Sequence, residues 1–255
     1  MLAIERKNEI LDKLRAEQRV LVSDLAEYYN VTEETIRRDL DKLEKEGYAT
    51  KTYGGAILGN STKTDLSYTI RNKTNVDAKN QIAALASRLI EDGDHLMLDD
   101  SSTSLYLAKK LKEKKNLTVI TNSVELVVEL NGIDGWTIIL TGGRLKPDSL
   151  ALVGDQTQQM LHRFHVDTAI MSCKGIDLEA GVTDSSEFHA QTKQSMLRCA
   201  KKKILILDSS KIDKVSFIDI APLDAFDIVV TNTAPSKPWL DFFADHNVEC
   251  LYPGK

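Results

Sequence analysis

Two short stretches of this sequence carry side chains suited to holding anions. The first is the adjacent pair Arg37 and Arg38, and the second is the run DDSSTS at residues 99–104. An arginine can bridge the acceptors of a guanine base or hold a phosphate. Hydroxyl groups ahead of a helix can hold a phosphate at the helix N-terminus, where backbone N–H groups and the dipole favour negative charge. The surrounding elements decide what each stretch can reach.

Residues 33–46 are predicted to form a helix that buries only one face. An N-cap residue and two acidic residues of the first turn mark its start, namely Thr32, Glu33 and Glu34. A single apolar stripe consists of Ile36, Leu40 and Leu43. The opposite face carries Thr35, Arg37, Arg38, Asp41 and Lys42. Gly47 stands where the helix is expected to end. The arginines are therefore predicted to face away from the core.

Two shorter helices are expected before this one, and a hairpin after it. Ser23 is predicted to cap the second helix, which ends near Asn30. Residues 48–53 are predicted to form a strand, Gly54 and Gly55 a turn, and residues 56–58 a second strand. Three short helices followed by a hairpin predict a winged helix-turn-helix domain over residues 1–58.

A helix of this kind fits the major groove of double-stranded DNA, and the hairpin would contact the backbone alongside it. We expect the DNA contacts to come from Ser23, Thr32, Glu33, Glu34, Thr35, Arg37, Arg38, Lys42, Lys51 and Tyr53. Two alternatives remain open at this stage. Charged residues on a helix are usually a solvated face, and residues 1–58 hold 10 basic against 12 acidic side chains. The second alternative is an interaction module whose N-terminal helices dock another protein instead of DNA.

Residues 77–255 alternate between strand-like and helix-like stretches. The predicted strands are residues 95–98, 117–120, 136–140, 166–171, 204–207, 227–230 and 248–251. Helices are predicted at residues 104–114, 124–130, 155–164, 187–200 and 239–247, after a first helix capped by Asp77. This alternation predicts an α/β domain with a mostly parallel sheet covered on both faces. Glycine and polar residues from Gly59 onward predict a linker over residues 59–76.

Polar residues follow almost every predicted strand. In an open parallel sheet these segments meet outside the carboxyl ends of the strands, where such folds bind ligands. Hydroxyls, amides, glycine backbone and lysines at one edge indicate a polar, anionic ligand. We expect the ligand contacts to come from Asp99, Asp100, Ser101, Ser102, Thr103, Ser104, Thr121, Asn122, Gly142, Gly143, Lys174 and Lys211. For any single loop, a plain helix cap or turn is the competing interpretation.

The strings TIRRDL (residues 35–40), LEKEG (residues 43–47) and YGGA (residues 53–56) resemble the N-terminal signature of the DeoR family of bacterial regulators of sugar catabolism. The similarity begins near Arg6 and Ile10. It departs from the family at Thr52, where a basic residue is frequent. Because helix-turn-helix proteins commonly read pseudo-palindromic operators as dimers, we expect a homo-oligomer, a dimer or a tetramer, to bind its operator through paired winged-helix modules.

The resemblance extends more loosely over the second half. DDSSTS stands in place of the family's phosphate loop, with Ser102 where a glycine is usual, and TNS, TGG, GVTD and DSSK also match. The family's effector domain is similar to ribose-phosphate isomerases. The resemblance therefore implies a phosphorylated sugar as the effector, and a repressor that the effector releases from DNA.

Composition limits the remaining classes of function. The 255-residue chain has 42% apolar and 28% charged residues and a net charge of −5, which predicts a globular protein without a polybasic arm. Three scattered cysteines exclude a disulfide scaffold, and we expect no membrane segment and a cytoplasmic location. Asp99, Asp100, Asp184 and Glu187 leave a sugar-phosphate isomerase as the alternative. No residue has the partner that a general base needs, so we assign no catalytic residue, metal or cofactor.

Overall fold

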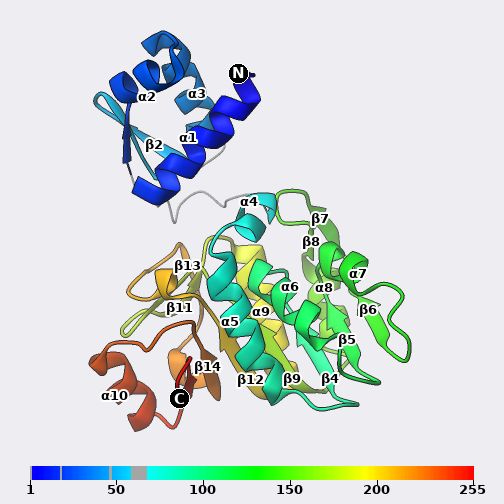
Figure 1. The fold of residues 1–255 in the computed structure, drawn as a ribbon. Coiled ribbons are helices and arrows are strands. Elements are labelled where there is room, and N and C mark those ends of the chain that lie inside the picture. The colour runs from blue at the N-terminus through cyan, green and yellow to red at the C-terminus, as the bar shows by residue number, and fades with distance from the viewer. Residues whose placement is uncertain (1, 18, 46–47, 59–67) are drawn as a thin grey trace. The chain divides into compact units, whose positions relative to one another are not determined.

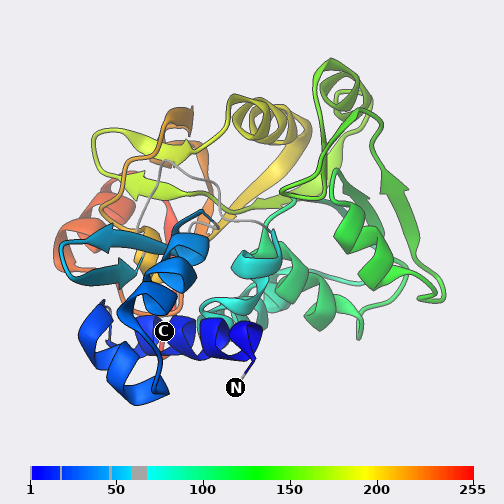
Figure 2. The same ribbon diagram turned by 90° about the horizontal axis from the view of Figure 1, so that it is seen from above.

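The computed structural model describes residues 2–17, 19–45, 48–58 and 68–255. The chain divides into two compact units, Met1–Ser67 and Tyr68–Lys255, which can be followed by colour in Figures 1 and 2. Each unit has hydrophobic core clusters of its own. Within the described residues, no helix combines the length and the apolar character needed to cross a bilayer.

The first unit contains three helices and a small antiparallel sheet. Its elements are α1 (Ala3–Glu17), β1 (Arg19–Leu21), α2 (Val22–Tyr29), α3 (Glu33–Lys45), β2 (Ala49–Thr52) and β3 (Gly55–Leu58). The sheet has the order β1-β3-β2, so the run that precedes α2 pairs with the second strand of the hairpin. The predicted winged helix-turn-helix is thus the observed architecture, with β1 as an additional strand.

Three expected helix ends in this unit can be compared with the structure. Asn30 ends α2 in the left-handed conformation, with φ of 50°, as predicted. The prediction for Ser23 is wrong, because α2 follows β1 directly and has Leu21 at its N-cap. The hydroxyl of Ser23 instead donates to Oδ1 of Asp24, 2.9 Å away. Gly47 lies outside the described residues.

The two glycines of the hairpin serve different purposes. Gly54 has φ of +88°, which places it in the turn conformation that glycine adopts without strain. Gly55 pairs with Leu21, and a Cβ at Gly55 would lie 2.1 Å from the carbonyl oxygen of Val20. The double glycine therefore closes the hairpin and lets β1 approach it.

The second unit is built on a seven-stranded sheet in which every pairing is parallel. Its order is β15 (Glu249–Leu251), β14 (Ile228–Val230), β12 (Ala200–Ile206), β9 (Val166–Met171), β4 (His95–Leu98), β5 (Thr118–Thr121) and β6 (Thr137–Leu140). These are the seven strands that the sequence predicted. Two core clusters lie on opposite faces, so Leu96 and Leu98 pack into one and Met97 into the other.

Helices cover both faces of this sheet (Figures 1 and 2). The core on one face contains side chains of α5 (Val76–Ala86), α6 (Ser102–Leu111) and α7 (Val124–Leu130). The core on the other face contains side chains of α8 (Asp155–Leu161), α9 (Glu187–Cys199) and α10 (Lys237–Asp245). The short 3-10 helices are η1 (Ser87–Leu89), η2 (Ser209–Lys211) and η3 (Leu223–Ala225). Asp77 is not the cap of α5, because Asn75 occupies that position.

Several short elements were not expected. Residues 68–76, which we assigned to the linker, contain α4 (Tyr68–Lys73) and the first residue of α5. An antiparallel sheet consists of β10 (Gly175–Asp177), β11 (Gly181–Asp184) and β13 (Ile218–Ala221), and a hairpin of β7 (Arg144–Lys146) and β8 (Ala151–Val153). These segments are too short for periodicity to identify, and their pairing depends on distant parts of the chain.

Candidate nucleic-acid interface and candidate effector site

Helix α3 places its two arginines on the solvent side. Its buried side chains are Ile36, Asp39, Leu40 and Leu43, and the side chains of Arg37 and Arg38 are 50% and 74% exposed. The hydroxyl of Thr32 accepts a hydrogen bond from the backbone N–H of Thr35 at 3.3 Å, which confirms the predicted cap. The helix is therefore anchored by one face and offers the other to a partner.

Each arginine is paired with a glutamate one turn earlier. Nη2 of Arg37 lies 2.7 Å from Oε2 of Glu33, and Nε of Arg38 lies 3.4 Å from Oε1 of Glu34. Exposed pairs of this type contribute about 0.3–0.5 kcal/mol, so a DNA phosphate can compete with the glutamates. Both guanidinium groups are accessible to a nucleic acid.

The hairpin is tied to α3 through Lys51, one residue pair before the turn, and is exposed at the turn itself. The ammonium of Lys51 pairs with Asp41, and its backbone N–H donates to Oε1 of Glu44 at 2.8 Å. The pairing with Lys51 holds the pKa of Asp41 below its ordinary value. Tyr53 is fully exposed at the turn, and Lys42 is exposed on α3. The wing thus keeps a fixed position beside the arginine face.

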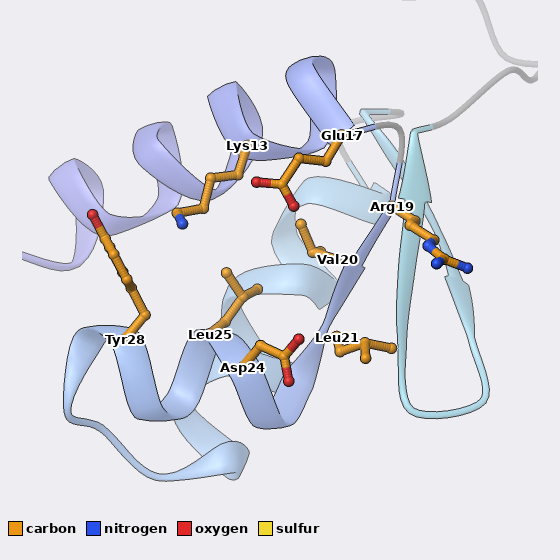
Figure 3. A pocket seen from close by; sticks show the side chains of 8 residues that line it. All are labelled: Lys13, Glu17, Arg19, Val20, Leu21, Asp24, Leu25 and Tyr28. Atoms are coloured by element: carbon orange, nitrogen blue, oxygen red, sulfur yellow. The ribbon is translucent and has the colours of Figure 1, made fainter.

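A pocket of about 420 Å³ lies on another part of this unit (Figure 3). Its lining comes from α1, β1 and α2, and none of it from α3. Nζ of Lys13 lies 3.8 Å from the ring centroid of Tyr28 at one end, and Glu17 and Arg19 lie at the other. The pocket contains none of the predicted DNA contacts.

The candidate effector site lies where the strand order of the sheet reverses. The chain runs from β4 to β5 and β6 on one side, and β9, β12, β14 and β15 follow on the other. The carboxyl ends of β4 and β9 therefore border a topological switch point, the place at which open α/β sheets bind ligands. The DDSSTS run begins at this point, directly after Leu98.

Asp99 joins the two halves of the sheet at the switch point. Its side chain is almost completely buried, and Oδ2 accepts a hydrogen bond from the backbone N–H of Ser172, beyond the end of β9, at 3.0 Å. Oδ1 accepts from the hydroxyl of Ser104 at 2.5 Å and from the backbone N–H of Ser101 at 3.2 Å. Asp99 therefore fixes the loop before α6.

The four hydroxyl residues divide into two pairs. Ser101 is the N-cap of α6, and its Oγ accepts from the backbone N–H of Ser104 at 3.0 Å. The Ser101 hydroxyl also donates to Oγ of Ser104, at 2.9 Å. Ser102 and Thr103 lie in the first turn of α6 and are about 5% and 4% exposed. One pair therefore holds the loop together, and the other remains available to a ligand.

Asp100 lies in a second buried network. Its Oδ1 is 3.2 Å from Nδ1 of His189, on α9, and 3.4 Å from Nδ2 of Asn122, which follows β5. Nε2 of His189 is in turn 3.4 Å from Nζ of Lys146, on β7. Burial alone would raise the pKa of Asp100, but the nearby charge of His189 lowers it far below its ordinary value. Asp100 is therefore held as a carboxylate.

A buried lysine connects Asp99 with β11. Nζ of Lys193, on α9, lies 2.5 Å from Oδ2 of Asp184 and 3.5 Å from Oδ2 of Asp99. Burial alone would lower the pKa of Lys193, but the charges of Asp184 and Asp99 raise it well above its usual range. Burial would raise the pKa of Asp184, and Lys193 lowers it instead. Lys193 and Asp184 are therefore both charged in the folded protein.

The other predicted contacts are spread along the same edge. Thr121 is structural, because its hydroxyl donates to the carbonyl of Leu98 at 2.7 Å. Gly143 is required by packing, since a Cβ would lie 2.2 Å from Oγ1 of Thr157. The carbonyl of Gly142 accepts from the same hydroxyl at 2.7 Å. Lys174 follows β9 and Lys211 ends η2, and both are half-buried.

Three side-chain oxygens at the strand ends are buried without a hydrogen-bond partner among the described residues. They are Oδ1 of Asn122, Oγ1 of Thr141 and Oγ1 of Thr231, which follow β5, β6 and β14. A buried polar atom without a partner costs free energy. Asn122 and Thr141 follow neighbouring strands, whereas Thr231 follows β14, which lies four places from β5 in the sheet.

The sequence interpretation missed the contribution of α9. His189 and Lys193 lie one helical turn apart and are both buried, and we assigned a role to neither of them from the sequence. The available signal was their position on the helix face that also carries Met196 and Leu197. Among the described residues, no group of three or more His, Cys, Asp or Glu side chains is arranged to hold a metal ion.

Two family models match the chain and together cover most of it. Residues 6–62 match the DeoR-like helix-turn-helix domain, and residues 74–233 match the DeoR C terminal sensor domain. The first match contains α3 and the hairpin, and the second contains α6, α9 and the strand ends described above.

The chain is also similar to curated regulators over nearly its whole length. It is 37% identical to the uncharacterized HTH-type transcriptional regulator YulB of Bacillus subtilis, over 91% of this chain and 90% of that protein. It is 36% identical to the HTH-type transcriptional repressor GlcR of the same organism, over 97% and 95%. Identity to a putative aga operon transcriptional repressor of Escherichia coli O157:H7 is 30%, over 98% and 94%.

Solved structures resemble the chain more distantly. Ribose 5-phosphate isomerase A of Methanocaldococcus jannaschii matches with a TM-score of 0.40 and 17% identity, over 55% of each chain. The eIF2B beta subunit of Chaetomium thermophilum matches with a TM-score of 0.45 and 22% identity, over 67% of this chain and 56% of that one.

Proposed function

The chain belongs to the DeoR family of DNA-binding transcription regulators, and from this premise we propose that it represses a carbohydrate-catabolism operon until a phosphorylated sugar binds the second unit. The observation that carries the proposal is the first turn of α6. There, the buried hydroxyls of Ser102 and Thr103 follow Asp100 directly in the chain, at the helix N-terminus. Oδ1 of Asp100 lies 3.4 Å from Nδ2 of Asn122, and Oδ1 of Asn122 has no hydrogen-bond partner among the described residues.

The chemistry of this edge fits a ligand with two different ends. The N-terminus of α6 favours a phosphate group, because its N–H groups and dipole favour negative charge. Lys174 and Lys211 are the lysines at the strand ends that we assign to charge contacts with the phosphate. The carboxylate of Asp100 and the amide oxygen of Asn122 are hydrogen-bond acceptors, which suit sugar hydroxyl groups. A phosphorylated sugar combines both requirements.

We assign the DNA contacts to the exposed face of α3 and the wing. Arg37 and Arg38 would reach base edges and phosphates in the major groove, and Lys51 and Tyr53 would contact the adjacent backbone. Helix-turn-helix proteins commonly read two half-sites as symmetric oligomers, so we propose a dimer or a tetramer as the binding form.

We propose that the second unit binds its sugar phosphate without converting it. An isomerase needs a general base that can accept a proton from carbon near neutral pH. Asp184 is a poor candidate, because Lys193 pairs with its carboxylate and lowers its pKa. Oδ1 of Asp184 also accepts a hydrogen bond from the backbone N–H of Ser185 at 2.7 Å.

Operator binding in the presence and absence of effector tests the proposal. A labelled DNA fragment from the region upstream of the protein's own operon is titrated with the full chain at fixed salt, because salt strongly changes DNA affinity. A panel of sugar phosphates is then added, with the corresponding unphosphorylated sugars as controls. We expect one phosphorylated sugar to weaken binding at least tenfold. Unchanged binding with every compound, together with no thermal shift, would refute the effector assignment.

A further inference from the structure

The helix that begins the second unit, α4, is held by residues of the candidate effector site. The hydroxyl of Tyr106 donates a hydrogen bond to the backbone carbonyl of Asn72, 3.1 Å away. Tyr106 lies on α6, about one turn from the N-terminus that we assign to phosphate binding. A shift of that turn therefore moves the group that contacts α4.

A buried lysine caps the C-terminal end of α4. Nζ of Lys79, on α5, donates hydrogen bonds to the backbone carbonyls of Arg71 and Thr74. Carbonyl groups at a helix end lack partners within the helix, so this contact replaces hydrogen bonds that water would otherwise supply. Lys79 is only 4% exposed, and its charge interacts with those of Asp208 and Lys211.

The turn between α4 and α5 is fastened to another strand-end loop. Nδ2 of Asn75 donates to Oδ1 of Asp208 at 3.1 Å, and Asp208 also caps η2 through the backbone N–H of Ser210 at 3.0 Å. Lys211, at the end of η2, is one of the lysines assigned to the phosphate. Helix α6 and the loop that leads into η2 therefore both contact the segment from α4 to the start of α5.

Arg71 adds positive charge from α4 itself. Its guanidinium charge acts on Asp100, on the loop before α6, and on Lys79. An anion at the N-terminus of α6 would enter the same neighbourhood and attract Arg71. The hydrogen bonds to the α4 backbone and the charge of Arg71 thus both couple α4 to the proposed ligand position.

We propose that α4 transmits ligand binding at the N-terminus of α6 to the DNA-binding unit, and that Lys79 is the positioning residue that keeps α4 in contact with the ligand-binding loops. The inference rests on the proposed function, because it takes the ligand to be a phosphorylated sugar. In the chain, residues 59–67 connect the winged-helix unit to α4, so the position of α4 determines where that connection ends.

Hydrogen–deuterium exchange on the full chain tests the contact without any ligand. Lys79→Met is compared with the wild type and with Lys112→Met, which changes an exposed lysine at the end of α6. We expect Lys79→Met to accelerate exchange at least tenfold in residues 68–75 and several-fold in residues 101–104 and 208–211, with Lys112→Met unchanged. Faster exchange in residues 68–75 alone, or in none of these segments, overturns the proposal. Tyr106→Phe, which removes one hydrogen bond, replaces Lys79→Met if that variant does not fold.

A second measurement adds probe ligands, namely inorganic phosphate, glucose 6-phosphate and fructose 1-phosphate. In the wild type, we expect the ligand to protect both residues 101–104 and residues 68–75 from exchange. In Lys79→Met, we expect the ligand to protect residues 101–104 only. Equal protection of residues 68–75 in both proteins overturns the proposal. If no probe protects residues 101–104 in the wild type, the proposed function loses its support, whereas the ligand-free experiment still decides the role of α4.

Discussion

Nε of Arg6, on α1, lies 2.6 Å from Oδ2 of Asp39, on α3, and both residues are almost completely buried. This ion pair fixes α3 to α1 across the core of the winged-helix unit. It also explains the aspartate that follows the two arginines in TIRRDL. Asp39 faces inward and orients the helix, so that Arg37 and Arg38 face outward.

We expect Arg6→Met to destabilise the winged-helix unit by about 3–5 kcal/mol, because it leaves the charge of Asp39 buried without its partner. Native-state hydrogen exchange of α1–α3 peptides at increasing urea measures the loss. Arg37→Met, which breaks an exposed pair, is the matched control and should cost less than about 1 kcal/mol. Equal losses in the two variants would contradict the assigned role of the Arg6–Asp39 pair.

Arg38→Ala should weaken operator binding by about 5-fold to 150-fold, the effect of losing about 1–3 kcal/mol of base or phosphate contact. Fluorescence anisotropy with labelled operator at matched salt provides the measurement, and the thermal midpoint should stay unchanged. Arg198→Ala removes an exposed arginine from the second unit and serves as the control. An operator affinity equal to that of the wild type would remove Arg38 from the interface.

Ser102→Glu should abolish the response to the effector, because it places a carboxylate where we position the phosphate. The readout is the thermal shift produced by the active sugar phosphate, and basal operator binding should persist. Ser236→Glu makes the same change at the N-cap of α10 and should respond like the wild type. A normal response of Ser102→Glu would exclude the α6 loop from the site.

The stability of the second unit should depend on pH through Lys79. Burial lowers the pKa of Lys79 from its ordinary value of 10.5 to about 8. Between these values the unfolded chain holds a proton that the folded chain has released, so the free energy of unfolding rises as the pH increases through this window. The rise is at most about 3 kcal/mol.

Urea unfolding of the second unit between pH 7.5 and 10.5 isolates this contribution. The difference between the wild type and Lys79→Met should grow with pH, whereas the difference between the wild type and Lys112→Met should stay constant. Identical pH profiles for the wild type and Lys79→Met would show that the Lys79 ammonium is solvated in the folded protein.

The central sheet could be predicted because strands that are buried on both faces have apolar residues at successive positions. Leu96, Met97 and Leu98 are apolar in succession since neighbouring side chains enter opposite cores. The strands β10, β11 and β13 have no such apolar run. They are three or four residues long, and β11 pairs with a strand more than 30 residues later.

The site could be predicted only in part. Asp99 and the hydroxyl run were recognisable because they directly follow a strand and precede a helix. His189 and Lys193 were not, because their partners Asp100 and Asp99 lie about 90 residues earlier in the chain. Local sequence indicates that a charged residue is on a helix, but only the tertiary fold brings it against a carboxylate.

The glutamates beside Arg37 and Arg38 have a further consequence for how the protein selects its operator. With Arg37 and Arg38 as the proposed DNA contacts, every encounter with DNA, whatever its base sequence, must first separate them from Glu33 and Glu34. This separation subtracts the same amount from the affinity for all sequences, and only a sequence that offers additional base contacts recovers it. In this proposal, the acidic first turn of α3 lowers the affinity of the protein for nonspecific chromosomal DNA.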